Sequence, residues 1–141
     1  MAAFNKFNQW PQDLATAVHN LNTAALMVML TNTAPVATNA VKADVAEIAA
    51  GFGYTAGGGA ATFVSGVQTG GLYKLVLNDV LFTAVGGTIA TFRYAVLYNS
   101  TPAVPLKPLI GWWDFQAAVN ITNGNSFLVD CDAANGVLTI N

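Results

Sequence analysis

The amino-acid sequence predicts an all-β fold, a jelly roll or β-sandwich of about eight short antiparallel strands preceded by a short helix. Segments rich in Val, Ile, Thr and aromatic residues recur from residue 25 onward and follow the two-residue period of strands. Gly86-Gly87, Asn123-Gly124 and Asn135-Gly136 separate these segments as hairpin turns would. Beyond Gly59, no connecting segment supplies the crossover helices that a parallel sheet requires.

We expect a single domain, because no linker, charge block or repeat divides the chain. An N-terminal arm over 1–11 precedes a short helix over 12–21, and the β-sandwich occupies 25–141. Pro11 suits the start of that helix, whose apolar residues recur at helical spacing: Leu14, Ala17, Val18 and Leu21. A further helical turn or two is expected over Ala43–Gly51, which the glycine would end.

The strand segments are bounded by turn residues and separated by two irregular regions. The expected strands are Ala25–Thr31, Ala61–Ser65, Leu72–Asn78, Val80–Ala84, Thr88–Asn99, Leu109–Phe115, Ala118–Ile121, Ser126–Asp132 and Val137–Ile140. A long irregular region runs from about Asn32 to Ala61, and such regions in compact domains are often binding elements. Thr101–Pro108 holds three prolines, which predicts a stiff surface loop.

The strand Thr88–Asn99 is apolar on both faces, which is unusual for a sandwich. One face carries Ala90, Phe92, Tyr94, Val96 and Tyr98, and the other carries Ile89, Thr91, Arg93, Ala95 and Leu97. Because neither face suits water, we expect another molecule to cover the outer one. Arg93, the one charge in this strand, is expected to pair with an aspartate or a backbone carbonyl.

Composition excludes several classes of function. Only 9% of the 141 residues are charged, against about 25% in an ordinary soluble domain, so a solvent-exposed monomer would usually carry more charge. The five basic residues are scattered and the net charge is −2, which argues against nucleic acid as a partner. No apolar run approaches the roughly 20 residues that span a bilayer, and the N-terminus lacks the pattern of a signal peptide, so we expect a protein made in the cytoplasm without a membrane partner.

No catalytic, cofactor-binding or metal-binding residues are predicted, because no constellation can be assembled. His19 is the only histidine, and the acidic residues are scattered, with Asp130 and Asp132 as the closest pair. Calcium would require more oxygen ligands than these two supply. Cys131 has no disulfide partner within the chain and is expected to be a small buried hydrophobe. We therefore expect a non-enzymatic protein.

Four aromatic residues are candidates for a protein interface. Trp112 and Trp113 are adjacent in a strand and so face opposite sides, which leaves one of them directed outward. An outward tryptophan could anchor a protein partner or stack on a sugar, and the scarcity of polar neighbours favours the protein. The candidates are Phe4, Trp10, Tyr98 and Trp112.

Several segments, in order along nearly the whole chain, resemble small virion structural proteins of tailed bacteriophages and prophages, the capsid decoration or cement proteins. The segments are Phe4–Phe7, Met29–Pro35, Glu47–Gly51, Gly53–Gly57, Tyr73–Leu77, Phe92–Asn99, Pro108–Asp114 and Asp132–Ile140. The resemblance implies a jelly-roll body on the outside of an icosahedral head, where it would bridge major capsid protein subunits and stabilise the shell. It also implies self-association, and two-fold symmetry makes a homodimer the expected form. The alternative is a tail or tail-tip β-sandwich that binds host surface carbohydrate.

Overall fold

The structure is a computed structural model that describes residues 2–141, so residue 1 of the expected N-terminal arm lies outside the described part. It is 45% strand and 6% helix, which confirms the all-β prediction. The elements in chain order are β1 (Phe4–Lys6), α1 (Trp10–Ala15), β2 (Leu26–Thr31), the 3₁₀ helix η1 (Lys42–Asp44), β3 (Gly59–Ala60), β4 (Phe63–Thr69), β5 (Leu72–Leu77), β6 (Val80–Thr83), β7 (Ile89–Asn99), β8 (Leu109–Ile121), β9 (Ser126–Val129) and β10 (Leu138–Ile140).

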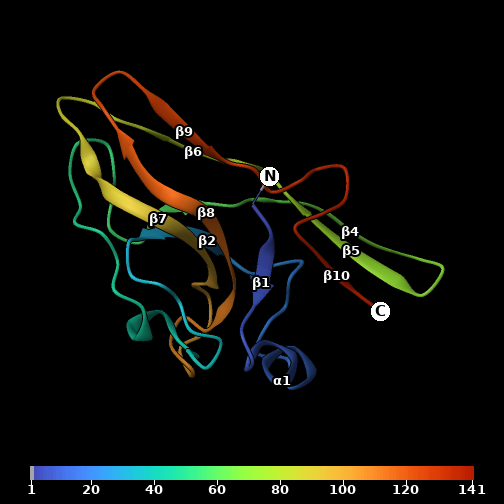
Figure 1. Cartoon of the computed structure of the whole chain (residues 1–141). Coiled ribbons are helices and arrows are strands. Elements are labelled where there is room, and N and C mark those ends of the chain that lie inside the picture. The colour runs from blue at the N-terminus through green and yellow to red at the C-terminus, as the bar shows by residue number, and fades with distance from the viewer. Residues whose placement is uncertain (1) are drawn as a thin grey trace.

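The strands form three antiparallel sheets within the described residues. The largest has the order β1-β8-β7-β2-β3, a second has the order β10-β5-β4, and β6 pairs with β9. Figure 1 shows the long β7 and β8 ribbons beside one another, β6 and β9 across the top, and the β4–β5 hairpin projecting to the right. This strand order does not establish a jelly roll, so that finer class stays a prediction.

The helical predictions were too long. Helix α1 ends at Ala15 rather than at residue 21, because Ala17 takes a positive φ of 63° and the chain turns back on itself. The backbone N–H groups of Val18 and His19 then both donate to the Asp13 carbonyl oxygen. Of the helix expected over Ala43–Gly51, only η1 forms, and the remainder is irregular apart from a bridge at its end.

The strand predictions differ from the structure chiefly at β8 and at the N-terminus. Two strands were expected between residues 109 and 121, but β8 runs unbroken for 13 residues. At the point where a break between two strands was expected, β8 has a bulge: Gln116 has a φ of 69°, and the register against β7 shifts. The N-terminal arm contributes β1, which pairs Phe4 with Trp113 and extends the large sheet by one strand.

The main core lies between the large sheet and the two smaller ones. Buried side chains from all three sheets meet there, including Leu75 of β5, Phe82 of β6 and Ile110 of β8. At the β9 end, three phenylalanine rings pack edge to face, with the Phe92 and Phe127 centroids 5.2 Å apart and those of Phe115 and Phe127 4.9 Å apart. Such contacts add to the apolar burial that holds β9 against β7.

The outer face of the large sheet is covered by the chain itself, which corrects the expectation that another molecule covers it. A second cluster of buried residues comprises Phe7, Met29, Val45, Val96, Tyr98 and Leu109. Phe7 comes from the N-terminal arm and Val45 from the irregular region after β2. The accessible surface is 6854 Å², close to the roughly 6,900 Å² expected for a monomer of this mass. The chain therefore buries its own core as a monomer, even though few of its residues are charged.

Candidate partner-binding surface

The four aromatic interface candidates do not form one surface. Tyr98 and Trp10 are only 2% and 3% exposed, so both rings pack almost entirely inside this chain and offer little surface to a partner. Phe4 and Trp112 are half-buried. Their rings lie on other aromatic rings of the same chain, Phe4 at 4.9 Å from Trp113 and Trp112 at 4.6 Å from Phe7, centroid to centroid.

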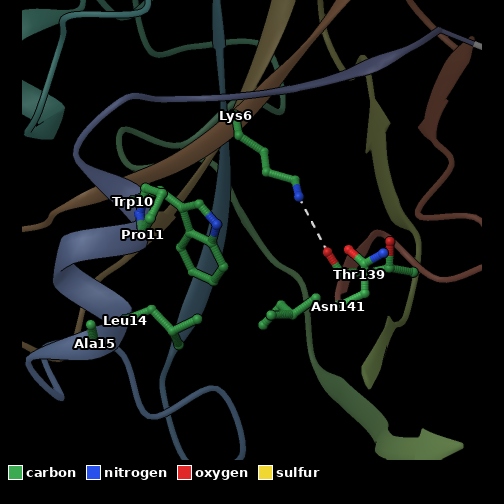
Figure 2. Close-up of a pocket in the computed structure, with 8 residues that line it drawn as sticks. Lys6, Trp10, Pro11, Leu14, Ala15, Thr139 and Asn141 are labelled. Atoms are coloured by element: carbon green, nitrogen blue, oxygen red, sulfur yellow. Dashed lines mark hydrogen bonds between the residues drawn. The ribbon is translucent and has the colours of Figure 1, made fainter. Parts of the chain in front are cut away.

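Trp10 nevertheless borders a groove between α1 and the C-terminal strand. Figure 2 shows the Trp10 ring and the Leu14 side chain directed from α1 toward the segment that ends in Asn141. The groove has a volume of about 370 Å³. Lys6 crosses one end and donates from Nζ to the Thr139 carbonyl oxygen at 3.2 Å. It is an apolar groove with one positive charge at its rim.

Glu47 joins three points of the irregular region that follows β2. Its carboxylate accepts hydrogen bonds from Lys42 Nζ at 2.6 Å, from the Tyr54 hydroxyl at 2.7 Å and from the Gly57 backbone N–H at 2.6 Å. Burial acts to raise the pKa of Glu47, but these three hydrogen bonds outweigh it and hold the pKa below its ordinary value. Tyr98 completes the link by donating from its hydroxyl to the Gly57 carbonyl oxygen at 2.7 Å. This network is structural, because it ties the cover to the strands beneath it.

Arg93 pairs with an aspartate, as expected. Its Nε and Nη2 donate to the two carboxylate oxygens of Asp114 at 2.8 and 2.9 Å, a bidentate pair across β7 and β8. The hydrogen bond from Arg93 keeps the pKa of Asp114 below its usual value. The Arg93 side chain is 38% exposed, so the pair lies at the surface and not in the core.

The carboxylates of the acidic residues near the C-terminus accept hydrogen bonds within local turns. Asp130 Oδ1 accepts from the backbone N–H of Asp132, and the carboxylate of Asp132 accepts from the backbone and side chain of Asn135. Cys131 between them is buried, as expected, and burial together with Asp79 and Asp130 raises the pKa of its thiol to about 12. Nowhere in residues 2–141 do three His, Cys, Asp or Glu side chains gather as a metal site would need.

Exposed apolar side chains gather instead over β6 and β9. Leu81 and Leu128 lie directly opposite one another in this two-stranded sheet and are 60% and 49% exposed. Val85 continues the same face beyond β6, and its backbone N–H donates to the carbonyl oxygen of Phe52, which is also exposed. We call these residues, Phe52, Leu81, Val85 and Leu128, the β6–β9 patch. The patch was not predicted from the sequence, because only the pairing of β6 with β9 brings Leu81 and Leu128 together.

Two further results bear on function. Among the helices of the described part, none is long and apolar enough to cross a membrane. A scan against protein-family models and searches of curated proteins and of solved structures returned no match for this chain.

Proposed function

We propose that this chain is a non-enzymatic capsid cement protein of a tailed bacteriophage, which binds the outside of the icosahedral head and bridges major capsid protein subunits. The proposal rests first on the resemblance of ordered segments along nearly the whole chain to decoration proteins. The observation that carries it further is the β6–β9 patch, because Leu81 and Leu128 place two exposed leucines directly opposite each other, and grouped apolar side chains at a surface are typical of a protein interface.

The arrangement of the patch suits a protein partner better than a small ligand. Leu81 and Leu128 stand on a two-stranded sheet with an open edge on either side. Thr83 and Ser126 are the next pair along the same face, between Leu81 and Val85, and they bond to each other through their hydroxyls at 2.7 Å. The face therefore combines exposed apolar side chains with a polar pair, as protein interfaces do. Repetition over a shell would allow each contact to be weak.

The experiment is a titration of purified protein onto heads that lack it, scored by bound protein and by the temperature at which the heads open. We expect saturable binding and a higher opening temperature. Replacing Leu81 with serine should weaken binding about tenfold, because it removes one exposed leucine from the centre of the contact. A lack of saturable binding by the unmodified protein would overturn the proposal.

Leu106 offers a matched control for that variant. It is a leucine of nearly the same exposure, 64%, but it lies in the loop between β7 and β8. Figure 1 shows this loop at the bottom of the molecule, at the opposite end from β6 and β9. Leu106→Ser should therefore leave head binding unchanged. Equal loss from the two variants would mean that the β6–β9 patch is not the contact.

We also propose that the free protein is a homodimer, with Phe4 and Trp112 as alternative aromatic residues at its interface. The two rings lie on opposite faces of the large sheet, because Phe4 pairs with Trp113 and stacks on it, whereas Trp112 stacks on Phe7. Both side chains are partly exposed. Sedimentation velocity at micromolar concentration should give the mass of two chains. A stable monomer would contradict this part of the proposal without affecting head binding.

A further inference from the structure

A buried side-chain triad joins the turn after α1 to the end of β7. His19 and Asp13 are each 4% exposed, and Asn99 is 1% exposed. Asn99 Nδ2 lies 3.2 Å from His19 Nδ1, whereas His19 Nε2 lies 4.0 Å from Asp13 Oδ2, and neither of these last two atoms has a hydrogen-bond partner. Two orphaned polar atoms inside a core are unusual, and they mark this cluster as incompletely satisfied.

The hydrogen bonds around Asn99 fix the protonation of the histidine ring. The backbone N–H of Thr101 donates to Asn99 Oδ1 at 3.0 Å, so the oxygen of this amide is on that side and its Nδ2 faces His19. Nδ2 can only donate, and His19 Nδ1 must therefore accept. A neutral His19 then carries its proton on Nε2, directed toward Asp13.

We propose that His19 is a pH-sensitive latch, which holds the turn after α1 against β7 while neutral and releases it when a solvent proton adds to Nδ1. The added proton would place an N–H of the ring against the N–H₂ of Asn99, two donors without an acceptor, so the hydrogen bond between them is lost. Turning the Asn99 amide to restore it would break the bond from Thr101. The latch is independent of whether the chain binds a phage head.

Opening the latch would change the groove beside α1. The Trp10 ring packs on the His19 ring with their centroids 5.2 Å apart, and Trp10 and Leu14 form one wall of the groove in Figure 2. Leu14 and His19 also line an adjoining hollow of about 420 Å³ that reaches Tyr73. Release of the turn would therefore loosen α1 from the C-terminal strand at acidic pH.

The groups that face His19 act in opposite directions. From α1, the Asp13 carboxylate favours the charged ring, and Trp10 carries no charge; from β7, Asn99 is uncharged. Tyr73 of β5 lines the same hollow as His19; its phenol is neutral near pH 7, and burial raises its pKa further above that range. Burial of the imidazole outweighs the attraction of Asp13 and lowers the pKa of His19 below 6.5, in agreement with the acceptor role of Nδ1.

The first test is an NMR titration of the His19 ring nitrogens in the intact protein. We expect the neutral ring to carry its proton on Nε2 and to titrate with a midpoint below 6.5. Asn99→Asp would present an acceptor to Nδ1 and should raise that midpoint, whereas Asp13→Asn should lower it further. A proton on Nδ1 in the neutral ring, or a midpoint at or above 6.5 in the unmodified protein, would overturn the latch.

The second test measures unfolding as a function of pH against His19→Gln. Glutamine can accept from Asn99 but does not titrate, so it is the matched control. In the unmodified protein, the unfolding equilibrium constant should rise by up to tenfold per pH unit as the pH falls from 6.5 toward the lowered midpoint, and then level off. The variant should lack this rise. If both proteins rise equally, His19 is not the latch; if the variant does not fold, the NMR result alone decides.

Discussion

Replacing Glu47 with alanine should loosen the irregular region after β2, because its hydrogen bonds hold three points of this region together. The substitution removes the acceptor of three hydrogen bonds at once and leaves the Gly57 N–H and the Tyr54 hydroxyl without it. Hydrogen bonds to a charged group contribute about 1.5–3 kcal/mol each. Because the Glu47 side chain is 14% exposed, water can replace part of this, and we expect a loss of about 3–5 kcal/mol in the free energy of unfolding.

Glu47→Gln is the matched control. The Tyr54 hydroxyl and the Gly57 N–H both donate to Oε1, and only Lys42 binds Oε2. A glutamine that keeps its oxygen at Oε1 preserves the first two bonds and loses the ion pair, at a cost of about 1–2 kcal/mol. The difference between the two variants therefore isolates the two bonds that join Tyr54 and Gly57 to Glu47.

Urea unfolding followed by tryptophan fluorescence measures these losses, because Trp10 and Trp113 are buried and become exposed on unfolding. Since the pKa of Glu47 is held below its ordinary value of 4.5, the stabilisation is present above that pH and is lost as the pH falls through the lowered pKa. The gap between Glu47→Ala and the unmodified protein should shrink accordingly. Two results would refute this prediction: a free energy of unfolding of Glu47→Ala within about 1 kcal/mol of that of the unmodified protein, or equal losses in Glu47→Ala and Glu47→Gln.

Three further predictions concern other parts of the molecule. Gly111→Ala should detach β1 from β8, because a Cβ at this position would overlap the Asn5 carbonyl oxygen, and limited proteolysis should then cut the N-terminal arm faster; an unchanged cleavage rate would contradict it. Cys131 should resist thiol reagents at pH 8 in the native protein and react only on unfolding, given its burial and raised pKa; rapid native labelling would count against it. Arg93→Ala should lower the melting temperature only slightly, because the pair with Asp114 is exposed, and a large drop by calorimetry would contradict that.

The strands were largely predictable because their signal is local. The alternation in Thr88–Asn99 and the β-branched and aromatic content of the later segments identified β5, β6, β7 and β10 nearly to the residue. The end of α1 was not predictable, since Ala17 adopts a positive φ that favours glycine and only its tertiary surroundings hold it there. The bulge at Gln116 likewise depends on the register with β7.

The candidate surface was harder to predict because it depends on which segments meet. Two apolar faces on β7 indicated a cover, but periodicity could not tell that Phe7 and Val45 of the same chain supply it. The burial of Tyr98 follows from that cover. Leu81 and Leu128 form one patch only because β6 and β9 pair in a particular register, and the two residues are far apart in the sequence.

The most direct test of the proposed function is a reconstruction of the intact phage particle by electron cryomicroscopy. The account predicts repeated copies of this fold on the outer surface of the head, with Leu81 and Leu128 of the β6–β9 patch directed toward the major capsid protein. Copies confined to the tail, or copies on the head whose β6–β9 patch faces solvent, would contradict it.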